Sequence, residues 1–239
     1  MKITVLYDNR QFADKWETGW GFACLVETEE DKLLLFDTGD DGDKLLNNIE
    51  KSGVDSNDID ALTFSHADWD HADGAEAFLK KNKSVEVFIP DKFPGKFINM
   101  VKQYGNKYRV TGYERTELIL GVFTTPVYKR GFSPREQGLV LAGKKDLALI
   151  TGCAHPGILY MVKEVKKLFR KNVGMILGGF HLMGLSRPAL TDLISKLKQE
   201  GVRVFAPCHC TGDKQIAAFQ EECGEDYIEV GAGRRIEYC

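Results

Sequence analysis

The sequence predicts an α/β fold in which two mixed β-sheets pack together and helices cover their outer faces, an αββα sandwich. Strand-like segments lie near both ends of the chain, helical segments alternate with them, and glycine or proline turns separate the two kinds. Hydrophobic residues make up 43% of the 239 residues and charged residues 28%, which suits a globular core with a solvated surface. No repeat or linker interrupts the pattern, so we expect one domain over residues 1–239.

The first half of the chain begins with strands. Apolar and β-branched residues predict strands at 2–7, 20–28 and 32–37. Helical spacing over 43–52, stopped by Gly53, predicts a helix. The remaining expected elements of this half are a buried strand at 60–64, a helix at 73–82 and a strand at 85–89.

The middle of the chain, from 91 to 136, has a weaker pattern in which glycines, prolines and aromatic residues alternate. We expect part of it to be strand and part a mobile flap. Regular patterns return afterwards. They predict a hairpin from strands 138–142 and 146–151, helices at 158–170, 188–200 and 212–222, and strands at 173–179 and 202–206.

Charge and composition exclude several classes of partner. The formal net charge is −3 and the isoelectric point is about 6.0, so no basic excess indicates nucleic-acid binding. No apolar run approaches the length of about 18 residues that a membrane span needs. The cysteines are scattered in a chain large enough to fold without disulfides, which favours a reduced, cytoplasmic protein. They are Cys24, Cys153, Cys208, Cys210, Cys223 and Cys239.

The residues that indicate chemistry are the histidines. The chain has five, each closely following a predicted strand: His66, His71, His155, His181 and His209. Ser65 to His71 reads Ser-His-Ala-Asp-Trp-Asp-His, which places four possible metal ligands on one turn after a buried strand. Imidazole and carboxylate ligands together suit zinc, iron or manganese. His66 and Asp68 can face one ion, and Asp70 and His71 a second. The structural alternative is a polar loop in which Asp73 caps the next helix.

These motifs resemble the metallo-β-lactamase superfamily, whose mark is His-x-His-x-Asp-His after a strand, an earlier Asp-x-Gly turn and separate downstream ligands. Here the turn is Asp37-Thr38-Gly39. Other segments are similar to a subgroup named for dihydropterin–ribofuranosylaminobenzene 5′-phosphate synthase. They are Leu6-Tyr7-Asp8-Asn9, Glu136-Gln137-Gly138-Leu139-Val140, Thr151 to Ile158, Gly178-Gly179-Phe180-His181-Leu182 and Pro207 to Gly212. The likeness runs from residue 2 to about residue 212.

The resemblance implies two divalent metal ions, with zinc as the first expectation and iron or manganese as alternatives. His66, Asp68 and His155 would bind one ion, and Asp70, His71 and His209 the other. Asp70 would also orient the attacking water or accept its proton. Asp37 would fix the turn or a histidine tautomer.

Two departures from the family pattern stand out. Asp68 replaces the family's second histidine, and Gly178-Gly179 stands where the family usually has a bridging aspartate. The only acids between His155 and His209 lie on predicted helices: Glu164, Asp192 and Glu200. We therefore hypothesise that Asp68 restores the missing charge, while His181 binds metal or hydrogen-bonds the substrate.

The expected function is a hydrolase that uses a metal-activated hydroxide on a small, anionic, ester-like substrate. Alternatives are a pterin-related synthase, a non-haem di-iron oxidoreductase and a non-enzymatic binding module.

Aromatic residues of 91–136 either wall a flat-ring pocket or pack in the core. Lys129, Arg130 and Arg135 either hold a phosphate or are solvated. We expect Cys208 and Cys210 to point away from His209 into packing or turns. The oligomeric state is not predicted.

Overall fold

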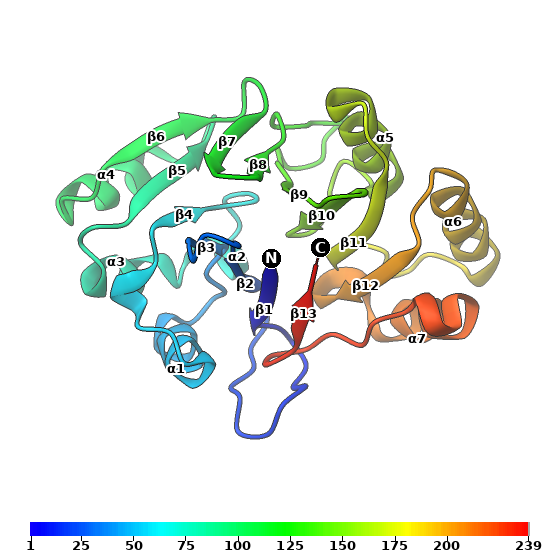
Figure 1. Cartoon of the computed structure of the whole chain (residues 1–239), viewed down its shortest axis with the longest axis horizontal. Helices are drawn as coiled ribbons and strands as arrows, with labels where there is room; N and C mark the ends of the chain where they lie inside the picture. The colour runs from blue at the N-terminus through cyan, green and yellow to red at the C-terminus, as the bar shows by residue number, and fades with distance from the viewer. Residues whose placement is uncertain (239) are drawn as a thin grey trace.

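Two mixed β-sheets pack face to face, and helices cover the outside of each, as the sequence predicts (Figure 1). The computed structural model describes residues 1–238. Cys239 lies outside the described residues. The layers matter for function because every candidate ligand follows the end of a strand.

The first sheet has seven strands in the order β13-β1-β2-β3-β4-β5-β6. Its strands pair antiparallel from β13 to β3 and parallel from β3 to β6. Their bounds are β1 Lys2–Tyr7, β2 Ala23–Glu27, β3 Leu33–Phe36, β4 Ala61–Thr63, β5 Glu86–Pro90, β6 Tyr108–Thr111 and β13 Arg235–Glu237.

The second sheet has six strands in the order β12-β11-β10-β9-β8-β7. Here β7 to β10 pair antiparallel, and β10, β11 and β12 pair parallel. Their bounds are β7 Thr116–Ile119, β8 Val122–Thr124, β9 Leu139–Ala142, β10 Leu147–Thr151, β11 Val173–Gly179 and β12 Val204–Cys208.

The helices divide between the two outer faces, with α1, α3 and α4 outside the first sheet and α5, α6 and α7 outside the second (Figure 1). Their bounds are α1 Gly42–Ser52, α2 Trp69–Ala72, α3 Ala75–Lys81, α4 Gly95–Gln103, α5 Ile158–Phe169, α6 Arg187–Gln199 and α7 Asp213–Cys223. The stop predicted for the first helix is confirmed, because Gly53 adopts a left-handed φ of 88° at the C-cap of α1.

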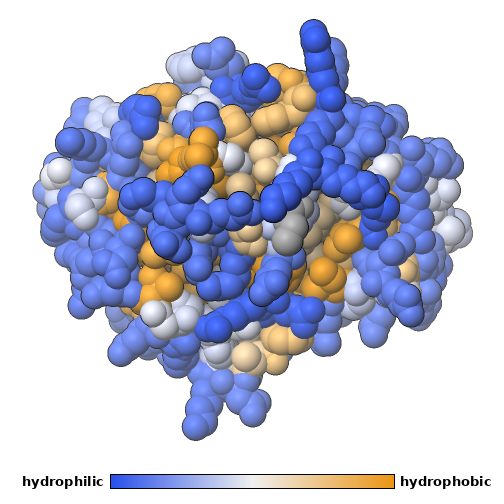
Figure 2. Space-filling view, in the orientation of Figure 1, coloured by the Kyte–Doolittle hydropathy of each residue, from blue (hydrophilic) through white to orange (hydrophobic). Residues whose placement is uncertain are grey.

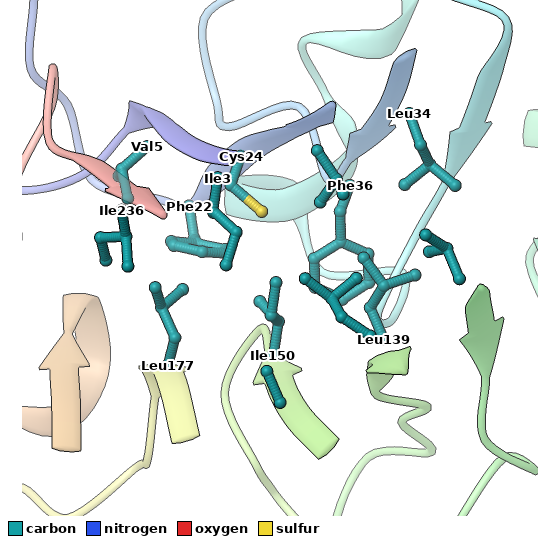
Figure 3. Packing of buried hydrophobic residues seen from close by; sticks show 14 of the residues in the cluster. Ile3, Val5, Phe22, Cys24, Leu34, Phe36, Leu139, Ile150, Leu177 and Ile236 are labelled. Atoms are coloured by element: carbon teal, nitrogen blue, oxygen red, sulfur yellow. The ribbon is translucent and has the colours of Figure 1, made fainter. Parts of the chain in front are cut away.

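The core has three parts, one between the sheets and one under each helical layer. Figure 3 shows Ile3 and Phe36 of the first sheet facing Ile150 and Leu177 of the second. Burial of this apolar surface is the main force that holds the sheets together. The strand ends are thereby fixed relative to one another.

Helix α4, strand β13 and the short helix α2 have no counterpart in the sequence prediction, which expects a turn where α2 lies. Helix α4 lies in the region of weak pattern. Its periodicity is hard to recognise because the helix is only nine residues long and buries only Phe97 and Val101. Strand β13 is three residues long and has exposed charged residues on either side of Ile236. Its conformation comes from antiparallel pairing with β1, a long-range contact that no local pattern reports.

The surface in the orientation of Figure 1 is mostly hydrophilic, with separate hydrophobic areas between the hydrophilic ones (Figure 2). Among residues 1–238, none of the helices combines the length and the apolar character that crossing a bilayer requires.

The packing between the sheets makes a stability prediction. Leu177 is fully buried there, whereas Leu120 is 63% exposed. Leu177→Ala should lower the free energy of unfolding by about 2–5 kcal/mol through the cavity it leaves. Leu120→Ala should change it by less than about 0.5 kcal/mol. Urea denaturation followed by circular dichroism measures both, and equal effects would contradict the assigned core.

Candidate metal centre

The candidate site lies at the edge where the parallel strands of both sheets end. Strands β3 and β4 run parallel in the first sheet, and β10, β11 and β12 run parallel in the second. Side chains that follow parallel strands gather at one edge, so segments distant in sequence meet there. The strands are followed, in order, by Asp37, the 66–71 segment, Cys153 to His155, His181 and His209.

Six side chains form two groups of three at this edge. Within each group, one donor atom of every residue lies within 4.8 Å of the others. The grouping is the one expected from the sequence, and ligation itself stays a prediction. One group is His66, Asp68 and His155, and the other is Asp70, His71 and His209.

Two ring nitrogens in these groups, His66 Nε2 and His209 Nε2, are buried and make no hydrogen bond. The closest carboxylate oxygens to them are Asp68 Oδ2 at 3.3 Å and Asp70 Oδ2 at 3.4 Å, respectively. Ligands of a tetrahedral zinc ion with bonds of about 2.0–2.1 Å are separated by about 3.3 Å. Buried polar atoms without partners are rare. The side chains present therefore fit a bound cation.

All four histidines of the two groups also have a hydrogen-bond acceptor next to one ring nitrogen. All four contacts use Nδ1, so Nε2 is the ring nitrogen that remains available to a metal ion. The pairs are His66 Nδ1 with Ser65 Oγ at 2.8 Å, His71 Nδ1 with Asp37 Oδ2 at 2.8 Å, His155 Nδ1 with Glu136 Oε2 at 2.9 Å and His209 Nδ1 with Asn9 Oδ1 at 3.0 Å.

Asp37 contacts a histidine of the candidate site, in agreement with the expectation that it fixes a histidine tautomer. Its fully buried carboxylate accepts hydrogen bonds from Ser65 N at 2.7 Å and Ser65 Oγ at 2.7 Å, besides the contact with His71. Because the Ser65 hydroxyl donates to Asp37, its oxygen accepts from His66 Nδ1. One carboxylate thus orients two of the histidines.

Glu136 is a residue whose role sequence reasoning missed, although its motif was noticed. Its fully buried carboxylate accepts from three successive backbone N–H groups, Cys153, Ala154 and His155, at 2.8–2.9 Å. It also contacts the His155 ring. The sequence signal for this role was a charged residue within the segment from Glu136 to Val140. Its partners lie 17 to 19 residues along the chain, so only the fold reveals them.

Asn9 and Asp8 were missed in the same way. Asn9 holds the His209 ring, and Asp8 Oδ2 accepts from His209 N at 3.1 Å. Burial raises the pKa of Asp8 to about 6, against the opposing effect of its hydrogen bonds. The loop after β1 thereby fixes a residue at the end of β12.

The electrostatics favour positive charge at the centre. Burial raises the pKa of Asp70, but its contact with His209 and the charge of His71 outweigh burial and lower it to about 2. Burial likewise opposes ionisation of Glu136, while hydrogen bonding to His155 lowers its pKa to about 2. Burial lowers the pKa of His66, but contact with Asp68 and the charge of Glu136 raise it to about 9.

His181 lies at the exposed rim of the site. Its ring centroid is 4.8 Å from that of His155, and its donor atom groups with those of His155 and Cys153. This position suits contact with a substrate or an ion, and its role stays a prediction.

The prediction for Cys208 is confirmed, and the one for Cys210 is wrong. Cys208 is fully buried in the core between the sheets. Cys210 Sγ instead lies 3.1 Å from Cys153 Sγ and groups with His209. Strand alternation ends at Cys208, because His209 has a φ of 47° and begins a 3₁₀ turn. The side chain of Cys210 is therefore turned toward the site.

Three smaller expectations are also resolved. Asp73 does not cap α3, whose N-cap is Gly74 without a side-chain hydrogen bond. Glu164 and Asp192 lie on α5 and α6, and Glu200 is the C-cap of α6, so none follows a strand end as the ligands do. Among the aromatic residues of 91–136, Phe93, Phe97, Phe123 and Tyr128 pack in the core or on α5, whereas Tyr113 and Phe132 are exposed.

An apolar hollow of about 340 Å³ is lined partly by residues that follow two of the histidines closely in the chain. It is lined by Ile158, three residues after His155, and by Leu182, next to His181. Arg130 and Lys163 supply positive charge to its lining. Arg130 Nη1 donates to Pro156 O at 3.3 Å, and its guanidinium lies 4.9 Å from the Tyr160 ring centroid.

Known proteins resemble this chain over nearly its whole length. A curated relative is 28% identical over 91% of this chain and 90% of its own length. It is the 7,8-dihydropterin-6-methyl-4-(beta-D-ribofuranosyl)-aminobenzene-5'-phosphate synthase of Methanocaldococcus jannaschii.

Solved structures share the fold. One, described as a metal-dependent hydrolase of the beta-lactamase superfamily, superposes with a TM-score of 0.83 at 27% identity, covering 99% of this chain and 98% of its own. The metallo-beta-lactamase fold protein YhfI from Bacillus subtilis gives 0.72 at 14% identity, with 99% of each chain covered.

A family model supplies the assignment. The model of the metallo-beta-lactamase superfamily matches residues 21–164, which include the Asp37 turn, the 66–71 segment and His155. The chain therefore belongs to the metallo-beta-lactamase superfamily.

Proposed function

We propose that this protein is a metal-dependent hydrolase acting on a small anionic ester at two divalent metal ions. The main support for this proposal is that two groups of potential ligands converge in the fold. Each group contains a buried ring nitrogen without a hydrogen-bond partner, His66 Nε2 in one and His209 Nε2 in the other. His66, Asp68 and His155 would hold one ion, and Asp70, His71 and His209 the other. Two such ions supply a water of lowered pKa and charge stabilisation for the substrate oxygen.

The chain's own groups have distinct tasks in this proposal. Asp70 has a pKa lowered to about 2, and its buried carboxylate lies 3.4 Å from His209 Nε2, so it can orient the attacking water and accept its proton. His181 at the rim can donate a hydrogen bond to the substrate. Arg130 and Lys163 border the apolar hollow, an arrangement that suits a molecule with an anionic group and an apolar body.

Zinc is the proposed ion, with iron or manganese as alternatives. Four histidine ligands favour zinc or iron, and the carboxylates of Asp68 and Asp70 are compatible with all three metals.

A second candidate function is a pterin-related synthase activity. It is favoured by the name of the relative that is 28% identical over most of both chains. The same centre would then activate a group of the substrate instead of water. A ribofuranosyl phosphate product formed without net hydrolysis would support this alternative.

The hydrolase proposal predicts a strict metal requirement. Protein stripped with a chelator should lose hydrolysis of phosphodiester or lactone substrates, and added zinc, manganese or iron should restore it. His209→Ala should abolish the restored activity. Metal analysis of the reconstituted chain should give two ions, and undiminished turnover by stripped protein would refute the proposal.

Glu136 offers a test of how the His155 loop is held. Glu136→Gln keeps the shape but removes the charge and one acceptor oxygen, so metal affinity should fall about 10–100-fold. Competition with a chromophoric chelator measures this affinity. Glu114→Gln, at an exposed position, is the matched control and should leave it unchanged. Equal affinities for both variants would show that Glu136 does not support the site.

Arg130 tests the anionic-substrate part of the proposal. Loss of one charged hydrogen bond predicts that Arg130→Ala raises KM for an anionic substrate about tenfold with kcat nearly unchanged. Arg115→Ala is the control, since that guanidinium instead lies over the Phe169 ring at the other end of α5. The same KM for both variants would place the anion elsewhere.

A further inference from the structure

Cys153 occupies the middle of the candidate site. It is 5% exposed, and its Sγ lies 3.4 Å from His71 Nε2. Its sulfur is also within 4.8 Å of donor atoms of His66, His155 and His209. The two proposed ligand groups have no residue in common. Cys153 nevertheless lies close to two histidines of each group, His66 and His155 in one and His71 and His209 in the other. This is the position of a side chain that can contact a bound ion.

The backbone fixes Cys153 in this place. A Cβ at Gly152 would lie 2.1 Å from Ser65 Oγ, so the chain passes directly against the start of the 65–71 segment. Cys153 N donates to Glu136 Oε1 at 2.9 Å, and Ala154 turns the chain with a φ of 53°. The thiol therefore enters the site from a rigid support.

No side chain from the end of β11 can take the same space. A Cβ at Gly179 would lie 2.2 Å from Gly152 O and 2.6 Å from Cys210 Sγ. Strands β10 and β12 close over this glycine, and their following residues, Cys153 and Cys210, meet with their sulfurs 3.1 Å apart. Sulfur thus occupies the region between the two ligand groups.

The contact distance also suits ligation. Zn–S bonds of about 2.3 Å and Zn–N bonds of about 2.0–2.1 Å place neighbouring ligands of a tetrahedral ion about 3.5 Å apart. The 3.4 Å between Cys153 Sγ and His71 Nε2 agrees with this spacing. The buried, unpartnered nitrogens of His66 and His209 independently indicate a cation.

We propose that Cys153 is a further metal ligand of this centre, whose thiolate would help to hold the bound metal. The inference rests on the proposed function. Binding replaces the S–H bond by sulfur–metal bonds and releases the thiol proton to solvent. The thiolate adds a third negative charge to Asp68 and Asp70 and favours zinc among the three candidate metals. Cys210 donates its S–H to Cys153 Sγ and positions it.

The test is zinc X-ray absorption on reduced, zinc-loaded protein, with cobalt substitution as a second readout. Wild type should show a zinc–sulfur path at about 2.3 Å, and its cobalt form should show thiolate-to-cobalt charge transfer. Both signals should disappear in Cys153→Ala. They should persist in Cys210→Ala and in the control Cys223→Ala on α7, which belongs to none of the ligand groups.

Each outcome decides between the proposals. Bound metal without a sulfur path in wild type overturns the role of Cys153 and leaves the hydrolase proposal standing, whereas wild type that binds no metal removes both. Signals lost in Cys210→Ala but kept in Cys153→Ala would reassign the ligand. A Cys153–Cys210 disulfide in metal-loaded protein would also overturn the proposal. If Cys153→Ala does not fold, a sulfur path in Cys210→Ala still supports Cys153.

Discussion

The candidate centre depends on one interaction repeated four times: a histidine held through Nδ1 by a neighbouring acceptor, so that Nε2 is left for the centre. The acceptors come from four places in the fold, the loops after β1 and β3, the start of the 65–71 segment and the loop before β9. Each fixes both the tautomer and the direction of a ring. Without these contacts the rings could rotate, and the strand ends alone would not define a site.

Four of the eight non-glycine residues with a left-handed φ among residues 1–238 lie at the same place. Asp37, Ala154, His181 and His209 are non-glycine residues with φ between 47° and 59°. Such left-handed residues each cost roughly 1–3 kcal/mol and persist only where the surroundings hold them. Here the surroundings are two sheets with a shared apolar core and backbone N–H groups that donate buried hydrogen bonds to Asp8, Asp37 and Glu136. Stability of the sandwich is thus linked to the geometry of the centre.

Periodicity, a local signal, predicted the layers, and the resemblance to the superfamily implied the six residues that converge. The 66–71 segment shows its ligands within one turn, and His155 and His209 each follow an apolar run. Local signals could not reveal Glu136 or Asn9, whose partners are distant in the chain. The direction of Cys210 depended on a left-handed residue at His209, which breaks strand alternation. Helix α4 and strand β13 were hidden for a similar reason, since their burial depends on tertiary contacts.

The centre also relates to its superfamily in a specific way. Glycines at the end of β11 leave no room for a side chain, while Asp68 supplies a carboxylate close to His66. Negative charge is therefore placed on the 66–71 segment and not on the strand. The space beside the glycines is occupied by the sulfur atoms of Cys153 and Cys210.

The most direct measurement is anomalous X-ray scattering from crystals of the metal-loaded protein, collected on both sides of the metal's absorption edge. The account predicts two anomalous peaks, one among His66, Asp68 and His155 and one among Asp70, His71 and His209. A map with no peak between the 66–71 segment and these downstream histidines, in protein loaded with zinc, manganese or iron, would contradict it.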